Sequence, residues 1–500
     1  MTAPAIYRTR ELRQVETDFA QLPLMERAGL AAARMARDML GERGARVLVL
    51  AGPRNNGGDG FVVARWLAAW FFEVTVVFRG DAAALSNDAR AAYDALLAAG
   101  GATRPDLPPG WRGELIVDAL FGIGLARAID GEYARWVEWA NASAIPILAL
   151  DVPSGLDADT GAVPGPCVVA SRTASFIALK PGLLTGEGPE RCGEIVALDL
   201  DLDLPPCPSG GSLLRWEDMV RRLPEPLQRA RRNVHKGSFG TLGIVGGAAG
   251  MVGAALLAGR AALFTGAGKT LVGLVSEGAP VLDPLAPELM LRSADAVLAA
   301  PIDALVCGPG LSAGARAVDI VRRAVGRSLP LLLDADALNV IADDPALAAA
   351  VAARGAPTLA SPHPGEAARL LGTTGDRIQR DRLGAASALA GRLNASVALK
   401  GAGTVIAHPD GSYAINASGN PGLASGGTGD TLSGFVGALL AQGLGGREAL
   451  ELAVCLHGAA ADALVARGVG PLGLTAGELP AAARTLLNAA AAQGKRAEAV

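Results

Sequence analysis

Cysteine is scarce in this sequence, and its few cysteines lie far apart. The chain of 500 residues has five of them and no C-x-x-C spacing: Cys167, Cys192, Cys207, Cys307 and Cys455. A small, odd number of scattered cysteines indicates neither a disulfide framework nor a zinc site. We therefore expect a protein of the reducing cytoplasm.

An apolar leader and a long hydrophobic run are also lacking. The start of the chain, MTAPAIYRTRELRQVETDF, carries charges where a secretion signal needs an apolar run. The most apolar later stretch, 252–268, is rich in Gly and Ala, contains Arg260 and is too short to span a bilayer. We expect no export signal and no membrane-spanning segment.

Neither sign of charge dominates, and lysine is rare. The 45 Lys and Arg residues nearly balance 49 Asp and Glu residues, so the basic surface that nucleic-acid binding requires is absent. The chain contains only five lysines: Lys180, Lys236, Lys269, Lys400 and Lys495. Where any positive charge suffices the chain uses Arg, so a retained Lys suggests a need for a compact ammonium group.

The first part of the chain alternates apolar strands with helical patterns. Its length exceeds one ordinary domain of ~100–200 residues, so we expect two or three packed units. Helices are predicted at 24–40, from 61, and at 86–99. Strands are predicted at 46–51, 73–78, 114–120, 145–150, 174–179 and 194–200. Such alternation predicts a parallel sheet covered on both faces, a doubly wound α/β domain.

A second α/β domain is predicted after the Pro- and Gly-rich stretch 201–211, with the boundary near 212–225. Its predicted elements are strands at 241–245, 271–275, 304–307 and 331–334, a hairpin at 396–407, and helices at 429–441 and 448–465. We expect the two domains to occupy 1–215 and 225–500.

Familiar nucleotide fingerprints are absent. After Gly122 and Gly124, the third glycine of G-x-G-x-x-G would fall on Arg127. In GAGKT, at 266–270, Leu263 stands where a P-loop needs its first glycine. The sequence therefore contains neither a Rossmann dinucleotide motif nor a Walker A motif.

The stretch GPRNNGGDG, at 52–60, lies between a predicted strand and helix, at the sheet edge where open α/β folds bind ligands. Its paired glycines would free backbone N–H groups for a phosphate, and Asn55, Asn56 and Asp59 supply oxygens for a cation or a ribose. A tight turn with an Asn or Asp cap is the alternative. Three further polar residues follow other predicted strands and favour a site: Asp118, Asp151 and Ser154.

The second half carries its own candidate residues. His363 and Glu366 lie in SPHPGEAARLL at 361–371, and Lys400 lies in LKGAGT. The stretch GGTG, directly before a long helix, would form an anion hole from free N–H groups, suited to a phosphoryl group. Asp430, at that helix start, is ordinarily a cap, but beside an anion hole we interpret it as a base that accepts a hydroxyl proton.

Together these motifs resemble those of the bifunctional NAD(P)H-hydrate repair enzymes, over nearly the whole chain. NNGGDG, VDALFGIGL and DVPSGLD follow the order of the epimerase half. HKGSFG, GPGLS, DADALN, SPHPGEAARLL, KGAGT and ASGGTGD follow that of the dehydratase half. The resemblance implies a Rossmann-like domain of the YjeF N-terminal type followed by a ribokinase-like domain.

In the first half, the resemblance implies a site for hydrated NADH or NADPH and a potassium ion. The implied substrate-binding residues are Asn55, Asn56, Gly57, Gly58, Asp59, Gly122, Ile123, Gly124, Leu125, Ala126, Arg127, Ala128 and Asp151. Asn56, Asp118 and Ser154 would hold potassium. Lys180, in SFIALKPG, matches a position near the epimerase pocket, so Asp151 and Lys180 are its candidate catalytic residues.

In the second half, the resemblance implies a dehydratase with ADP or ATP as co-substrate and a magnesium ion on its phosphates. The residues implied for the hydrate are Ala254, Gly310, His363 and Asp430. Those implied for the adenine nucleotide are Lys400, Gly401, Ala402, Gly403, Thr404 and Gly429. Bacterial members of this family favour ADP, which we expect here, together with a homo-oligomeric state.

The sequence departs from the family pattern at two places, and the motifs are also compatible with one rival function. Ser312 stands where the family often has glycine, and Lys269 and Thr270 stand where apolar residues are expected, which puts nucleotide contacts in doubt. The rival is a ribokinase-like small-molecule kinase with a non-catalytic nucleotide-binding first domain, because such kinases phosphorylate hydroxyls from the same type of helix start.

Overall fold

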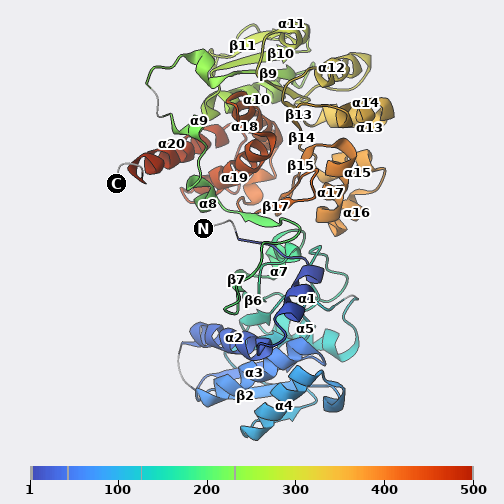
Figure 1. Cartoon of the computed structure of the whole chain (residues 1–500), viewed down its shortest axis with the longest axis vertical. Helices are drawn as coiled ribbons and strands as arrows, with labels where there is room; N and C mark the ends of the chain where they lie inside the picture. The colour runs from blue at the N-terminus through green and yellow to red at the C-terminus, as the bar shows by residue number, and fades with distance from the viewer. Residues whose placement is uncertain (1–3, 42–43, 126, 230–231, 498–500) are drawn as a thin grey trace. The chain divides into compact units, whose positions relative to one another are not determined.

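The computed structural model describes residues 4–41, 44–125, 127–229 and 232–497 (Figure 1). The chain forms two compact units, Pro4–Gly211 and the part from Ser212 onward. Each unit has its own sheet and its own hydrophobic core, so each is described by itself.

The first unit is built on a parallel sheet of seven strands in the order β3-β2-β1-β4-β5-β6-β7. The strands are β1 (Arg46–Ala51), β2 (Glu73–Phe78), β3 (Thr103–Arg104), β4 (Leu115–Ala119), β5 (Ile147–Leu150), β6 (Arg172–Phe176) and β7 (Glu194–Leu198). The strand order reverses between β1 and β4, and open α/β sheets bind ligands at the carboxyl ends of the strands at such a point.

Helices cover both faces of this sheet, as the continuous burial of β1 from Val47 to Ala51 requires. Val47 and Val49 pack with α1 (Thr9–Asp18), α2 (Leu24–Leu40), α3 (Asn55–Ala69) and α4 (Asn87–Ala98), whereas Leu48 and Leu50 pack with α5 (Gly131–Ala142). Two short helices, α6 (Pro181–Leu184) and α7 (Gly188–Arg191), follow β6. The predicted doubly wound α/β class is therefore confirmed.

Two predicted boundaries in this unit are wrong, and both errors concern the site. Helix α3 begins at Asn55, not at 61, so NNGGDG forms its first turns. Strand β6 ends at Phe176, not at 179, because Ile177 adopts a left-handed conformation with φ of 67°. The chain turns there, three residues before Lys180.

The second unit contains a ten-stranded sheet in the order β11-β10-β9-β12-β13-β14-β15-β16-β17-β8. Its strands are β8 (Ser212–Leu214), β9 (Thr241–Gly246), β10 (Lys269–Leu274), β11 (Met290–Ser293), β12 (Ala304–Cys307), β13 (Leu331–Leu333), β14 (Thr358–Ala360), β15 (Ser396–Leu399), β16 (Val405–Ala407) and β17 (Tyr413–Asn416). The predicted hairpin is confirmed as β15 and β16, which pair antiparallel, whereas the strands from β11 to β15 are parallel.

The helices of this unit also lie on both faces of their sheet. They are α8 (Trp216–Val220), α9 (Glu225–Gln228), α10 (Val252–Thr265), α11 (Ala294–Ala299), α12 (Ala315–Val325), α13 (Asp336–Asp343), α14 (Pro345–Ala352), α15 (Pro364–Leu371), α16 (Gly375–Arg380), α17 (Arg382–Leu393), α18 (Thr428–Ala441), α19 (Gly446–Val465) and α20 (Leu479–Ala497). Helices α10, α18, α19 and α20 share one core cluster. A Cβ on Gly434 would lie 2.2 Å from the Ala258 carbonyl oxygen, so α18 approaches α10 at backbone distance.

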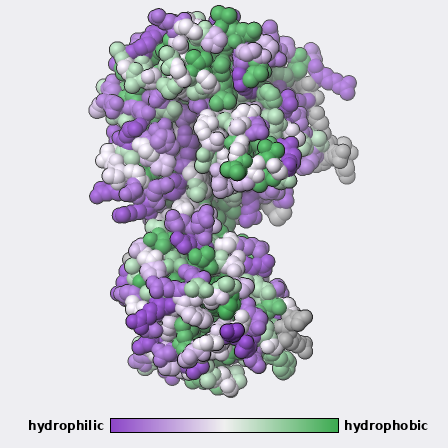
Figure 2. All heavy atoms as spheres, turned by 180° about the vertical axis from the view of Figure 1, so that it is seen from behind, coloured by the Kyte–Doolittle hydropathy of each residue, from purple (hydrophilic) through white to green (hydrophobic). Residues whose placement is uncertain are grey.

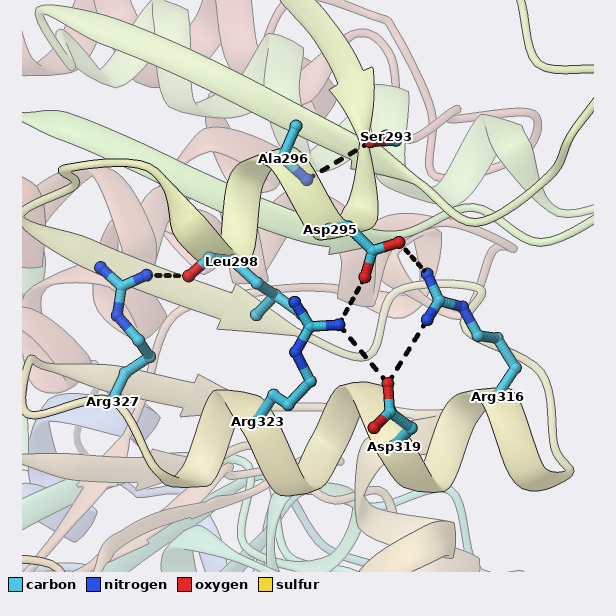
Figure 3. Close-up of polar contacts among 8 residues, drawn as sticks. All are labelled: Ser293, Asp295, Ala296, Leu298, Arg316, Asp319, Arg323 and Arg327. Atoms are coloured by element: carbon cyan, nitrogen blue, oxygen red, sulfur yellow. Dashed lines mark hydrogen bonds and ion pairs between the residues drawn. The ribbon is translucent and has the colours of Figure 1, made fainter.

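Helices α11 and α12 are joined by an exposed network of ion pairs (Figure 3). Asp295 on α11 accepts hydrogen bonds from Arg316 and Arg323 on α12, and Asp319 lies between those two arginines. Since these side chains are about half exposed, each pair contributes only about 0–1 kcal/mol.

The described surface mixes polar and apolar side chains on the face that Figure 2 shows. Among the helices of the described ranges, none combines the length and the apolar character needed to cross a membrane.

The close packing at the start of α3 gives a first prediction. A Cβ on Gly57 would lie 1.9 Å from the carbonyl oxygen of Gly52, a backbone atom that cannot turn aside. We expect Gly57→Ala to destabilise the first unit by about 1–3 kcal/mol, the range typical of overpacking. Urea unfolding of the full chain measures it.

The matched control is Gly391→Ala, in α17, where an added Cβ meets no atom within 4 Å. That variant should be more stable by about 0.5–1 kcal/mol, because alanine restricts the unfolded chain more than glycine does. Equal unfolding midpoints for Gly57→Ala and wild type would contradict the packing argument.

Candidate functional site

A cavity of about 1270 Å³ opens at the carboxyl ends of β1 and β4 in the first unit. Most of the predicted substrate-binding residues line it: Asn55, Asn56, Asp59, Gly122, Ile123, Gly124, Leu125, Arg127, Ala128 and Asp151. Gly57 and Gly58 do not line it, because their missing side chains make room for Gly52 and for Met25. Ala126 lies outside the described residues. The predicted residues thus form part of this wall, and other residues that line it, such as Tyr133 and Ile177, were not predicted.

Asp118 and Ser154 form a tight buried pair at the ends of two strands. The Ser154 hydroxyl donates to Asp118 Oδ1 at 2.6 Å, and the Ser154 amide donates to Oδ2 at 2.8 Å. Burial raises the pKa of Asp118 to about 6, although these hydrogen bonds and the one from Leu120 favour the carboxylate. The pair is therefore a fixed, buried source of oxygen ligands.

Asn56 is buried with both polar atoms of its side chain unsatisfied. Neither Oδ1 nor Nδ2 has a hydrogen-bond partner, and only 6% of the residue is exposed. An unpaired buried amide costs about 1–3 kcal/mol, so such a group indicates a missing ligand. Because α3 packs against β4, Asn56 and Asp118 belong to contacting elements. The donor set of amide, carboxylate and hydroxyl oxygens suits a hard monovalent cation.

Asp151 and Lys180 form a buried ion pair against the same cavity. Lys180 Nζ lies 2.6 Å from Asp151 Oδ1 and donates to Ser175 Oγ at 3.0 Å and to the Phe176 carbonyl at 2.8 Å. All three of its protons are thus directed, and the side chain is fully buried. Asp151 Oδ2 accepts from the Ile123 amide at 2.9 Å, which ties this pair to the Gly122–Gly124 turn.

Two further carboxylates stand near this pair. Burial raises the pKa of Asp59 well above its usual value, with Asp151 and Glu16 adding to the rise and Lys180 opposing it. Glu16, on α1, lines the cavity, and burial and Asp151 raise its pKa too. Glu16 was not predicted, because α1 has no motif and precedes the sheet that it joins.

The second site lies at the carboxyl ends of β13, β14 and β15. Asp334 follows β13 and is 1% exposed, and Lys400, which follows β15, donates to Asp334 Oδ1 at 2.8 Å. Ser433, on α18, donates to Asp334 Oδ2 at 2.7 Å. This network draws two strand ends and one helix together. The roles of Asp334 and Ser433 were not predicted, although an aspartate directly after a strand in DADALN was a usable signal.

Asp430 lies in the first turn of α18, as predicted. Burial raises its pKa to about 6, with Asp334 and Asp336 adding to the rise and Lys400 opposing it. Within the described ranges, no group donates a hydrogen bond to its carboxylate, and no carbonyl accepts from the amides of Gly429 and Asp430. The helix start therefore offers free N–H groups beside a carboxylate that can accept a proton.

His363 is the N-cap of α15, and Glu366 completes the cap. The Gly365 amide donates to His363 Nδ1 at 2.9 Å, and the His363 amide donates to Glu366 Oε2 at 2.8 Å. Burial, Lys400 and Arg369 lower the pKa of His363, which favours the uncharged imidazole. His363 therefore caps α15. Its ring is exposed, and the ring atom Nε2 lies 3.3 Å from Glu366 Oε1.

The remaining predicted residues fall into two groups. Ala254 and Gly310 adjoin, because a Cβ on Gly310 would lie 3.1 Å from that of Ala254. The loop from Lys400 to Thr404 has left-handed glycines at Gly401 and Gly403, and the Thr404 hydroxyl donates to the Gly401 carbonyl. Arg382, 1% exposed, lies directly beneath Gly401. Ala402 lies in that exposed loop.

The two departures from the family pattern have different outcomes. Ser312 adopts φ of 67°, a conformation that glycine favours, and its amide donates to Asp336 Oδ2 at 2.7 Å. Lys269 and Thr270 begin β10, at the amino edge of the parallel sheet. They therefore lie at the opposite edge of the sheet from Lys400 and Asp334, which follow the carboxyl ends of their strands.

Comparison with known proteins agrees with both halves. The NAD(P)H-hydrate dehydratase family matches residues 242–479, and the family of the YjeF-related protein N-terminus matches residues 21–182. The structure is similar to that of an ADP/ATP-dependent NAD(P)H-hydrate dehydratase from Bacillus subtilis, co-crystallised with ATP and Mg2+, with a TM-score of 0.49. The two are 33% identical, covering 56% of this chain and 99% of that one.

Full-length relatives extend the match over both units. A bifunctional NAD(P)H-hydrate repair enzyme of Coxiella burnetii is 36% identical over 97% of this chain and 99% of its own length. That of Escherichia coli strain K12 is 40% identical over 93% of this chain and 89% of its own length. The family models and these full-length matches agree with the motifs, and the chain belongs to the family of bifunctional NAD(P)H-hydrate repair enzymes.

Proposed function

We propose that this protein repairs hydrated NADH and NADPH. Its first domain, 1–215, would interconvert the R and S forms of the hydrate, and its second domain, 225–500, would dehydrate the S form with ADP or ATP. The observation that carries the proposal is the convergence of Asp430, Gly429 and Lys400 at the start of α18: a Cβ on Gly429 would lie 3.4 Å from Lys400 Nζ. A base, free amides and a cation there suit phosphoryl transfer to a hydroxyl.

In the dehydratase reaction, the C6 hydroxyl of the hydrate must become a better leaving group than hydroxide. Asp430 takes the hydroxyl proton while the hydroxyl oxygen attacks the terminal phosphoryl group of ADP, and AMP leaves. The C6–O bond then breaks, phosphate departs, and loss of a C5 proton restores the dihydronicotinamide ring. The free amides at the start of α18 stabilise the charge on the phosphoryl group during transfer.

The other residues of this domain would hold the two substrates. Residues 400–404 and Gly429 would bind the adenine nucleotide, and Ala254, Gly310 and His363 the hydrate. Magnesium, when bound to the phosphates, would neutralise their charge. The described residues include no group of three His, Cys, Asp or Glu side chains arranged to hold a metal ion.

In the epimerase domain, the 1270 Å³ cavity would take the hydrated nicotinamide nucleotide. The Asp151–Lys180 pair is the candidate proton-transfer group, because Asp151 lines the cavity and the fully buried Lys180 fixes its carboxylate. Asn56, Asp118 and Ser154 would hold potassium, and the two unsatisfied polar atoms of Asn56 support that assignment. Bound potassium would supply positive charge beside the substrate.

We also infer a cytoplasmic location and a homo-oligomeric state. All five cysteines are free, which supports a protein of the reducing cytoplasm. A homo-oligomeric state stays a prediction.

Replacing the proposed base tests the dehydratase. We expect Asp430→Asn in the full chain to lower kcat for dehydration of the S hydrate about 10²–10⁴-fold, the usual contribution of a general base. Recovery of the reduced-nicotinamide absorbance, together with AMP release, measures the rate. The exposed Asp376, on α16, gives the matched control Asp376→Asn, which should match wild type. A stable phosphoester in place of NADH would instead identify a small-molecule kinase.

The pH dependence should report the same carboxyl group. Burial raises the pKa of Asp430 to about 6, and a base acts only when deprotonated. We expect kcat/KM for dehydration to fall about tenfold per pH unit below pH 6 and to level off above it. Asp430→Asn should lose this acid limb. A flat wild-type profile between pH 5 and 8 would contradict the assignment.

The epimerase pair can be tested without disturbing the dehydratase. We expect Asp151→Asn to lower the rate at which the R hydrate is consumed by more than about 10²-fold, since the group that moves the proton is lost. The S hydrate should be dehydrated at the wild-type rate. The exposed Asp203 gives the control Asp203→Asn. Unchanged R-to-S conversion would refute the role of Asp151.

A further inference from the structure

The carboxylate of Asp334 organises the second site without an assigned role. Its oxygens are both occupied, one by Lys400 Nζ at 2.8 Å and the other by Ser433 Oγ at 2.7 Å. The Asp334 side chain is 2% exposed, and Ser433 is fully buried. Ser433 lies three residues after Asp430 on α18, so one carboxylate links the ends of β13 and β15 to that helix, one turn beyond Asp430.

The link fixes where the Lys400 ammonium lies. A lysine side chain has four rotatable bonds and loses much conformational freedom when its ammonium group is held in one place. That of Lys400 is still 22% exposed, yet its head lies over the first turn of α18, at 3.4 Å from the place of a Cβ on Gly429. Burial opposes its charge, but Asp334, Glu366 and Asp430 outweigh that effect and keep its pKa above the usual value.

We propose that Asp334 is a positioning residue of the dehydratase: it holds the Lys400 ammonium over the start of α18, where that group meets the phosphates of ADP. The proposal rests on the proposed function, because it requires an adenine nucleotide at this helix start. Asp334 itself is too deeply buried to contact the nucleotide. Its effect on binding therefore passes through Lys400.

A second consequence concerns Asp430. The charged groups that face its carboxylate are Asp334 after β13, Asp336 on α13 and Lys400 after β15. The negative charge of Asp334 makes Asp430 harder to ionise, and Lys400 makes it easier. The effect of Asp334 on the pKa of Asp430 exceeds the opposing effect of Lys400. Neutralising Asp334 should therefore move the acid limb of dehydration to lower pH even if the released Lys400 ammonium moves away. A residue that only supported the fold would not move it.

The test uses the full chain with Asp334→Asn, which keeps the shape of the side chain and removes its charge. Calorimetric titration with ADP and magnesium chloride should show at least about tenfold weaker binding, as expected when one partner of a buried charge pair is removed. The acid limb of kcat/KM should lie at lower pH than in wild type. Asp343→Asn, an exposed aspartate at the end of α13, is the matched control and should match wild type in both.

A double-mutant cycle with Lys400→Met separates action through Lys400 from an independent effect. In the Lys400→Met background, Asp334→Asn should change ADP affinity by less than about threefold. If the two substitutions weaken ADP binding by factors that multiply in the double variant, the proposal is overturned. It is also overturned if Asp334→Asn alone binds ADP within twofold of wild type.

If Asp334→Asn does not fold, Ser433→Ala decides the question. It frees Asp334 Oδ2 and loosens the carboxylate, so ADP binding should weaken by about three- to tenfold, the usual effect of losing one hydrogen bond. Unchanged ADP affinity in Ser433→Ala would overturn the proposal. If the wild-type protein binds neither ADP nor ATP, the proposed function is refuted as well. If wild type and Ser433→Ala bind ADP equally well, only the role of Asp334 is refuted.

Discussion

Each unit of this protein buries a lysine–aspartate ion pair at the carboxyl edge of its sheet, and the rest of each site is arranged around that pair. Lys180 pairs with Asp151 at 2.6 Å in the first unit, and Lys400 pairs with Asp334 at 2.8 Å in the second. Removing a charge from water costs several kcal/mol, so a buried ion persists only where a partner and further hydrogen bonds satisfy it. Phe176 and Ser175 do this for the first pair, and Ser433 for the second.

The sheet topology explains why these ion pairs lie at the carboxyl edges of the two sheets. In a parallel sheet, all carboxyl ends point to one edge, so residues that follow different strands meet there. The strand order reverses between β1 and β4 in the first unit, and the large cavity opens at that point. In the second unit, Asp334, His363 and Lys400 follow three successive strands of the same edge. The resemblance between the two sites is thus a result of the shared α/β architecture.

Burial then sets the proton affinities on which the proposed chemistry depends. It raises the pKa of Asp118 and of Asp430 to about 6, and that of Asp59 well above its usual value. The nearby ammonium group opposes the rise at Asp430 and at Asp59. A base poised slightly below neutral pH is deprotonated and still accepts a proton readily. The same side chains in water would be weaker bases.

The sequence by itself determined the α/β class of both halves, because hydrophobic periodicity and glycine turns are local signals. It also located part of the first cavity wall and the helix start at Asp430. The predicted start of α3 was six residues too late, because glycines are poor helix formers. Glycine is needed in this turn because Gly57 packs directly against the backbone of Gly52.

Only the tertiary structure decided which charged groups meet. Lys400 and Asp334 are 66 residues apart in the chain, and Ser433 is 99 residues from Asp334. Glu16 joins the first cavity from a helix without a motif, and the unsatisfied amide of Asn56 becomes evident only when its surroundings are packed. Pairing and desolvation are properties of groups brought together from distant positions, and no local pattern of residues encodes them.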